Sequence, residues 1–80
     1  MSERHARDRP TVERQLRMAL QHVATGQRLV ARQRALLTTL EAHGHSTQMT
    51  EKLLQQLESA QAMHVADRDR LVDELARFID

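Results

Sequence analysis

Apolar residues recur along the chain at alternating steps of four and three positions, the pattern of a helix that packs along another helix. The first repeat begins at Val12 and continues through Leu16, Ala19, Val23, Gly26, Val30, Gln33, Leu37 and Leu40. After a break, a second repeat follows the seven-residue spacing of Leu57, His64, Leu71 and Phe78. The two repeats predict two long α-helices, over about residues 10–43 and 47–79.

The segment between the repeats has the features of a short connection. Gly44 can adopt the left-handed conformation that ends a helix, and the hydroxyl of Ser46 or Thr47 can cap the next helix. A turn of about three residues, 44–46, requires antiparallel neighbours. Pro10 suits a first helical turn, whereas the charged residues 1–9 predict a disordered tail. The predicted fold is therefore all-α: one antiparallel two-helix hairpin, a coiled coil, over residues 10–80.

The apolar stripe is broader than a two-stranded seam needs. Several apolar residues outside the seam should stay exposed on a single hairpin: Leu29, Leu36, Val65, Val72 and Ile79. Exposed rows of this extent typically mark an interface. We therefore expect two copies to pair into a homodimeric four-helix bundle, with docking of one hairpin on a different protein as the alternative.

Five histidines raise the question of a metal site. If the chain reverses near residue 45, His22 lies near Asp67, and His64 lies over Gly26, which leaves room for its ring. His22, His64 and Asp67 are thus candidate ligands for Zn²⁺ in a bundle. No HxxxH or ExxH pair shares a helix face, and ordinary packing explains both histidines more simply. The sequence predicts no resident metal or cofactor, and a metal-binding bundle stays open as an alternative.

Gln33 and His64 interrupt otherwise apolar lines. In the same register Gln33 faces Glu58. Buried polar groups of this kind often fix register and oligomeric state, so these two residues are interpreted as part of the helix interface.

Charge divides the chain into a basic and an acidic half, although the net charge is only +1. Residues 1–43 hold eight arginines against four acids, and residues 44–80 hold four basic residues against seven acids. Four arginines on the outer side of the first helix could follow phosphates: Arg14, Arg17, Arg28 and Arg32. A solvated face beside the acidic second helix explains them more simply. A nucleic-acid-binding regulator is therefore an alternative function.

Composition excludes several classes of function. The chain has no Cys, Trp or Tyr, so disulfides, thiolate zinc sites and aromatic base stacking are ruled out or weakened. It has no glycine-rich phosphate loop, nucleophile elbow or cofactor fingerprint, which predicts a protein that is not an enzyme. No apolar run could span a bilayer and no h-region follows the N-terminus, so we expect no membrane partner and a cytoplasmic location.

Four short stretches together carry a resemblance: His22-Val23-Ala24 before Gly26, Arg32-Gln33-Arg34, Gly44-His45 before Thr47, and His64 before Asp67-Arg68-Asp69-Arg70-Leu71. In these the chain resembles a group of small bacterial helical-hairpin proteins with no established function. The resemblance covers about residues 16–75 and implies a hairpin of bacterial origin. The expected function is a non-enzymatic, self-associating interaction module, an adaptor or small regulator whose partner is itself or another protein.

Overall fold

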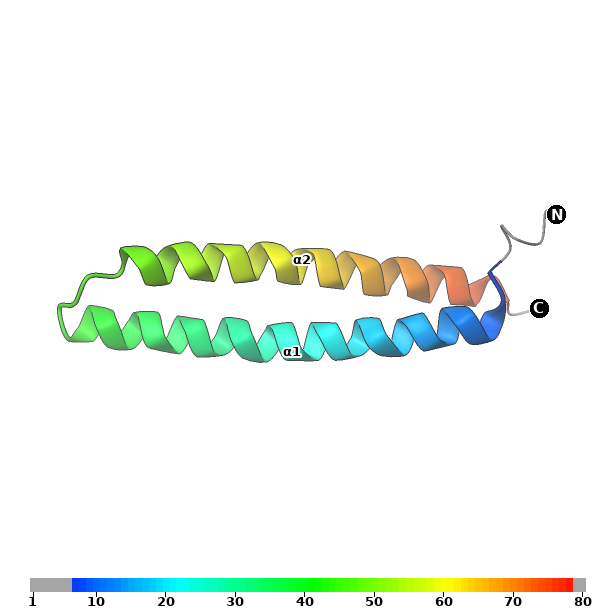
Figure 1. Cartoon of the computed structure of the whole chain (residues 1–80), viewed down its shortest axis with the longest axis horizontal. Helices are drawn as coiled ribbons and strands as arrows, with labels where there is room; N and C mark the ends of the chain where they lie inside the picture. Colours follow the sequence, from blue (N-terminus) through cyan, green and yellow to red (C-terminus); the bar gives the residue numbers. More distant parts are fainter. Residues whose placement is uncertain (1–6, 79–80) are drawn as a thin grey trace.

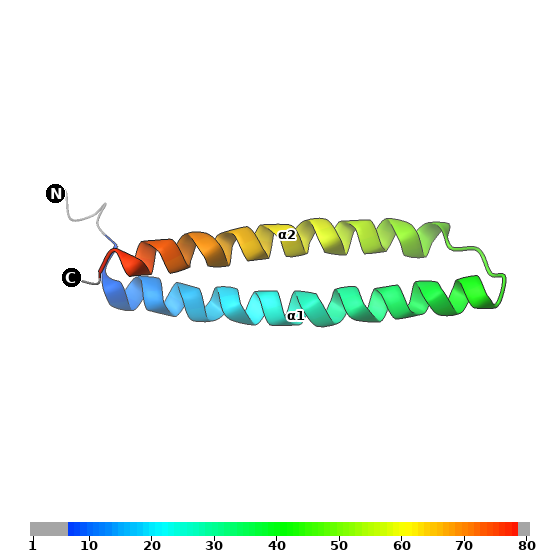
Figure 2. The same ribbon diagram turned by 180° about the vertical axis from the view of Figure 1, so that it is seen from behind.

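The computed structural model describes residues 7–78, which form two α-helices and the segments that flank them. Helix α1 spans Arg9–Ala42 and helix α2 spans Gln48–Ala76. The helices lie side by side along their whole length and run in opposite directions (Figures 1 and 2). The hairpin measures 61 × 21 × 14 Å, so it is a single layer of helices. The predicted all-α antiparallel hairpin is confirmed.

Asp8 starts α1. Its Oδ1 atom accepts a hydrogen bond of 3.0 Å from the backbone N–H of Thr11, while Pro10 occupies the first turn, where no N–H is required. The hydrogen bonds from Thr11, together with the charge of Arg14, lower the pKa of Asp8 below its usual value. The predicted tail 1–9 was therefore too long: Asp8 caps the helix and Arg7 pairs with Glu74 of α2 at 3.1 Å. Residues 1–6 lie outside the described residues.

The connection between the helices is five residues long, 43–47, instead of three. Gly44 has a φ of 69°, and the N–H groups of Gly44 and His45 donate to carbonyls of the last turn of α1. Thr47 precedes α2 but makes no side-chain cap, since its hydroxyl bonds to the Glu51 carboxylate. The predicted cap by Ser46 or Thr47 is therefore wrong. Helix α2 ends at Ala76, earlier than predicted, in a turn through Phe78.

The best-buried side chains lie at the end of the hairpin away from the turn. Val12, Ala19 and Leu71 are at most 2% exposed and form one cluster, against which Leu16, Leu75 and Phe78 pack half-buried. Beyond them, Val23 and Val30 are also buried. Other seam positions are only half-buried: Gly26, Gln33, Leu37, Leu40, Leu57 and His64. Water reaches these positions because one layer of two helices covers the seam from neither side.

Gly26 and Gln61 set the register at the middle of the hairpin. The Gln61 side chain lies against Gly26, where a Cβ atom would overlap its amide, and Nε2 donates to the Val23 carbonyl at 2.9 Å. The predicted register, with His64 over Gly26, is wrong by about one helical turn. Gln is long enough to fill the space over the glycine and still reach a backbone carbonyl, so it takes the place expected for the histidine.

Gln33 also has a different partner from the predicted Glu58. Its Nε2 atom donates to the carbonyl of Thr50 at 3.2 Å, and Glu58 instead pairs with Arg34 at 2.8 Å. Two polar residues at the seam, Gln33 and Gln61, therefore hold the helices together by hydrogen bonds from side chain to backbone.

Candidate interaction surface and histidine pair

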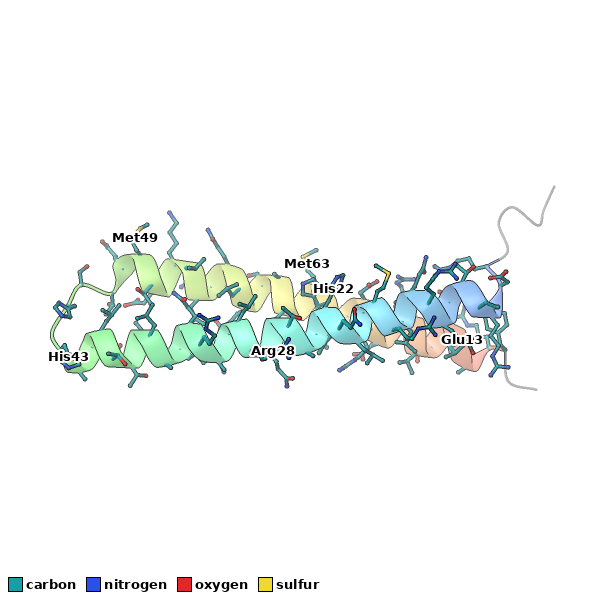
Figure 3. The ribbon with its side chains drawn as sticks, turned by 60° about the horizontal axis from the view of Figure 1, so that its bottom comes forward. Glu13, His22, Arg28, His43, Met49 and Met63 are labelled. Atoms are coloured by element: carbon teal, nitrogen blue, oxygen red, sulfur yellow. The ribbon has the colours of Figure 1, made fainter. Side chains whose placement is uncertain are left out.

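Large apolar side chains are exposed mainly on one side of the hairpin, here called the apolar face: Met18, Leu29, Leu36, Met49, Leu53 and Met63. Leu29, Leu36 and Leu53 line one depression between the helices, and Met49 joins Leu36 and Leu53 in a second. Met18 lines a third depression together with His22. Figure 3 shows Met49, Met63 and His22 projecting from the same, upper side of the hairpin. Both helices therefore contribute apolar side chains to this face.

The opposite face is interrupted by charge. Val65 lines a depression there with Val30 and with Arg34 and Glu58, which form a cross-helix ion pair. The seven-residue spacing places Leu20 on the line of Arg34, and Val72 on the line of Val65. Leu20 and Val72 are each 48% exposed. They are the only other large apolar side chains that are exposed in the described part of the chain.

The sequence predicted only part of the apolar face. Leu29 and Leu36 were among the residues expected to be exposed at an interface. Val72 is exposed but lies on the other face, Val65 lies on that face and is half-buried, and Ile79 lies outside the described residues. The methionines of the apolar face were missed. Met49 and Met63 flank the seam of α2 by helical spacing, but the register that would have aligned them with Leu29 and Leu36 was not known.

Ion pairs connect side chains at the end of the hairpin away from the turn. Glu74 pairs with Arg7 at 3.1 Å and with Arg70 at 3.5 Å, and Arg70 also pairs with Asp67 at 2.6 Å. Two of the six acidic residues of α2, Asp67 and Glu74, are paired here, and a third, Glu58, pairs with Arg34.

The four arginines named as possible phosphate contacts lie on one stripe of α1, and all are exposed. Arg14 and Arg28 donate to the hydroxyls of Thr11 and Thr25, one turn earlier. Within residues 7–78, none of Arg14, Arg17, Arg28 and Arg32 has a carboxylate within 4 Å. The acidic helix does not neutralise this stripe.

His22 and His64 contact each other across the helices. Their ring centres are 5.2 Å apart and the rings are tilted by 44°. Asp67 lines the depression beside His22, but its carboxylate is held by Arg70. Over the described range, no group of three or more His, Cys, Asp or Glu side chains is placed to hold a metal ion. The sequence named all three candidates, and the structure brings the two histidines together.

A second histidine pair lies in the connection. The rings of His43 and His45 are 6.2 Å apart, and Nδ1 of His43 bonds to the carbonyl of Thr39 at 2.9 Å. That bond occupies one ring nitrogen of His43 at the end of α1.

Neither helix of residues 7–78 has an apolar stretch of the length that a membrane crossing requires. Comparison with models of protein families, with curated proteins and with solved structures finds no match to this chain. The resemblance to bacterial helical-hairpin proteins therefore stays an expectation.

Proposed function

We propose that this protein is a non-enzymatic, self-associating helical module, in which two hairpins pack through their apolar faces into a four-helix bundle. The observation that supports it is the exposure of six large apolar side chains on one side of a single-layer hairpin. The bundle would act in the cytoplasm as an adaptor or small regulator, presenting its charged outer faces to other molecules.

The amount of exposed surface favours a second copy. The chain exposes 6283 Å², roughly 1,300 Å² more than the area expected for a folded monomer of its mass. A standard interface buries about 800 Å² on each partner. The radius of gyration of 18.0 Å, against about 12 Å for a compact domain of this length, reflects the elongated, 61 Å long shape of the hairpin. A second layer of helices would cover part of this exposed surface.

The apolar face is also suited to meeting its own copy. The depressions around Leu36 and Leu53 include only two charged side chains, Lys52 and Arg32; the other polar lining residues are Gln33, Thr50 and Gln56. A surface with little charge avoids like-charge repulsion when it pairs with itself. The opposite face carries the Arg34–Glu58 ion pair beside Val30 and Val65, whereas the Asp67–Arg70 ion pair of the apolar face lies in the depression beside Met18, away from Leu36 and Leu53.

Light scattering coupled to size exclusion tests the proposal, with refractive-index detection because the chain has no Trp or Tyr. We expect twice the chain mass of 9.2 kDa for the wild type and the single mass for Leu53→Lys, because the lysine would be buried in the bundle. Val72→Lys is the matched control, since Val72 is 48% exposed and Leu53 46% exposed, on opposite faces.

Three results would contradict the proposal: a wild type that stays monomeric at millimolar concentration, a dimer unaffected by Leu53→Lys, or a dimer broken only by Val72→Lys. Circular dichroism of each variant shows whether the hairpin itself is still helical, which separates lost association from lost folding.

A second candidate function rests on the arginine stripe, whose four guanidinium groups lack carboxylate partners among the described residues. From Arg14 to Arg32 the stripe extends about 27 Å along α1. If four phosphates were contacted, duplex affinity should fall roughly hundredfold between 50 and 200 mM salt. Anisotropy of a labelled duplex measures this, with all four arginines replaced by Gln as the control. Absence of binding at 50 mM salt would exclude this function.

A further inference from the structure

We propose that His22 and His64 bind one divalent transition-metal ion between α1 and α2. The two rings come from different helices and lie 5.2 Å apart at the middle of the hairpin. Both ligands belong to one chain, so the site can form on a single hairpin, although His22 lies on the apolar face through which two hairpins would pair.

The separation of the rings matches that of two imidazoles on one ion. An ion about 2.1 Å from one nitrogen of each ring, with a tetrahedral angle between the bonds, sets the ring centres roughly 5 Å apart. The rings are tilted by 44° and are not stacked in parallel. A tilt of this kind allows one nitrogen of each ring to point at a shared position.

The ring nitrogens are available to an ion. His22 is exposed and His64 is half-buried, so the position between them opens to solvent. No residue of the described range hydrogen-bonds to either ring. His43 differs in this respect, since its Nδ1 atom is engaged by the Thr39 carbonyl. A metal ligand must present a free, deprotonated ring nitrogen.

The ligand set selects the class of ion. Imidazole suits Cu²⁺, Zn²⁺ and Ni²⁺ and does not suit Mg²⁺ or Ca²⁺, and Cu²⁺ binds such sites most tightly. Two protein ligands leave the remaining positions to water, because the described residues supply no third ligand. This is not the closed four-ligand site on which a fold depends. The ion would instead add a removable link between two helices that are already paired.

The test uses the full chain without a polyhistidine tag, at about pH 7.5, because imidazole binds metal ions in its deprotonated form. Calorimetric titration with Cu²⁺ and with Zn²⁺ measures affinity, and thermal unfolding with and without each ion measures the link. We expect a higher Tm with the ion, and roughly tenfold or greater loss of affinity in His22→Asn and in His64→Asn, since even outer-shell partners of metal ligands contribute that much.

The matched control is the double variant His43→Asn/His45→Asn, which removes the other histidine pair and should bind both ions as the wild type does. Binding that persists in His22→Asn and His64→Asn, or that disappears in the double variant, would overturn the proposal. So would a wild type that binds neither ion at millimolar concentration. Titration at a chain concentration low enough to keep the protein monomeric measures the site on the single hairpin, so failure of the dimer leaves these outcomes unchanged.

Discussion

The two halves of the hairpin differ in how far they bury their own apolar residues. In the terminal half, residues 7–26 and 61–78, the side chains of Val12, Ala19 and Leu71 are almost completely shielded from water. In the turn half, residues 27–60, Val30 is the only buried residue. The same seam pattern thus forms a closed core at one end and an open one at the other.

The cause lies in what surrounds the seam. In the terminal half Leu16, Leu75 and Phe78 pack around the core, and the ion pairs of Glu74 and Arg70 lie beside it. In the turn half four residues of the apolar face stay exposed beside the seam: Leu29, Leu36, Met49 and Leu53. The terminal half therefore supplies most of the buried core of the hairpin, whereas the seam of the turn half stays open to water.

The largest effect is expected for Leu71→Ala in the terminal half. Leu71 is 1% exposed, so truncation leaves a cavity and should lower the free energy of unfolding by about 2–5 kcal/mol. Urea unfolding followed by circular dichroism, at a chain concentration low enough to keep the protein monomeric, measures the loss.

Leu37→Ala is the control from the turn half. Leu37 is only half-buried, so its truncation in the monomer should cost clearly less. Equal losses at the two positions would show that the halves do not differ in stability, and would remove the basis of the comparison.

Gly26→Leu tests the boundary between the halves. The space over Gly26 is filled by the Gln61 side chain, so a larger residue should destabilise the hairpin by about 1–3 kcal/mol through overpacking. In a Gln61→Ala background the cost should shrink, because the leucine then enters vacated space. A stabilising Gly26→Leu substitution with Gln61 in place would show that the helices do not approach closely here.

Much of the fold follows from the sequence. The heptad spacing predicted both helices, and Gly44 predicted the position of the turn. The register could not be predicted, because the spacing identifies which helix faces meet but not how far one helix is shifted along the other. The space over Gly26 is large enough for the side chain of either His64 or Gln61. Gln61 occupies it and donates a hydrogen bond to the Val23 carbonyl. A residue pattern does not show which backbone carbonyls such a side chain can reach.

The candidate site depends on register, and was therefore predicted less well. His22 and His64 were recognised as candidate ligands, but they come into contact only when one helix is shifted by one turn from the predicted register. In the same way Leu29 and Leu36 were identified as exposed, whereas Met49 and Met63 could not be assigned to their surface until the two helices were aligned.

Methionine oxidation should act on self-association and leave the hairpin intact. Met18, Met49 and Met63 are each more than half exposed on the apolar face, and a sulfoxide turns each into a polar side chain. Burying unpaired polar groups should weaken the dimer roughly tenfold or more. Sedimentation equilibrium before and after mild peroxide treatment measures this, with the triple Met→Leu variant as the resistant control. Equal dissociation of the control would mean that oxidation acts elsewhere.

The smallest effect is expected at Asp8, which caps α1 from an exposed position at the terminal end. Asp8→Ala should lower Tm slightly and speed amide exchange in the first turn, because the N–H of Thr11 loses its acceptor. The pKa of Asp8 is lowered in the folded chain from 3.8, so the charged cap stabilises α1 above that pH, and this contribution is lost as the pH falls through the lower, folded value. Asp8→Asn keeps the cap without the charge, so its Tm should fall less with acid than that of the wild type. Identical acid profiles for the wild type and Asp8→Asn would show that the carboxylate charge contributes nothing to the start of the helix.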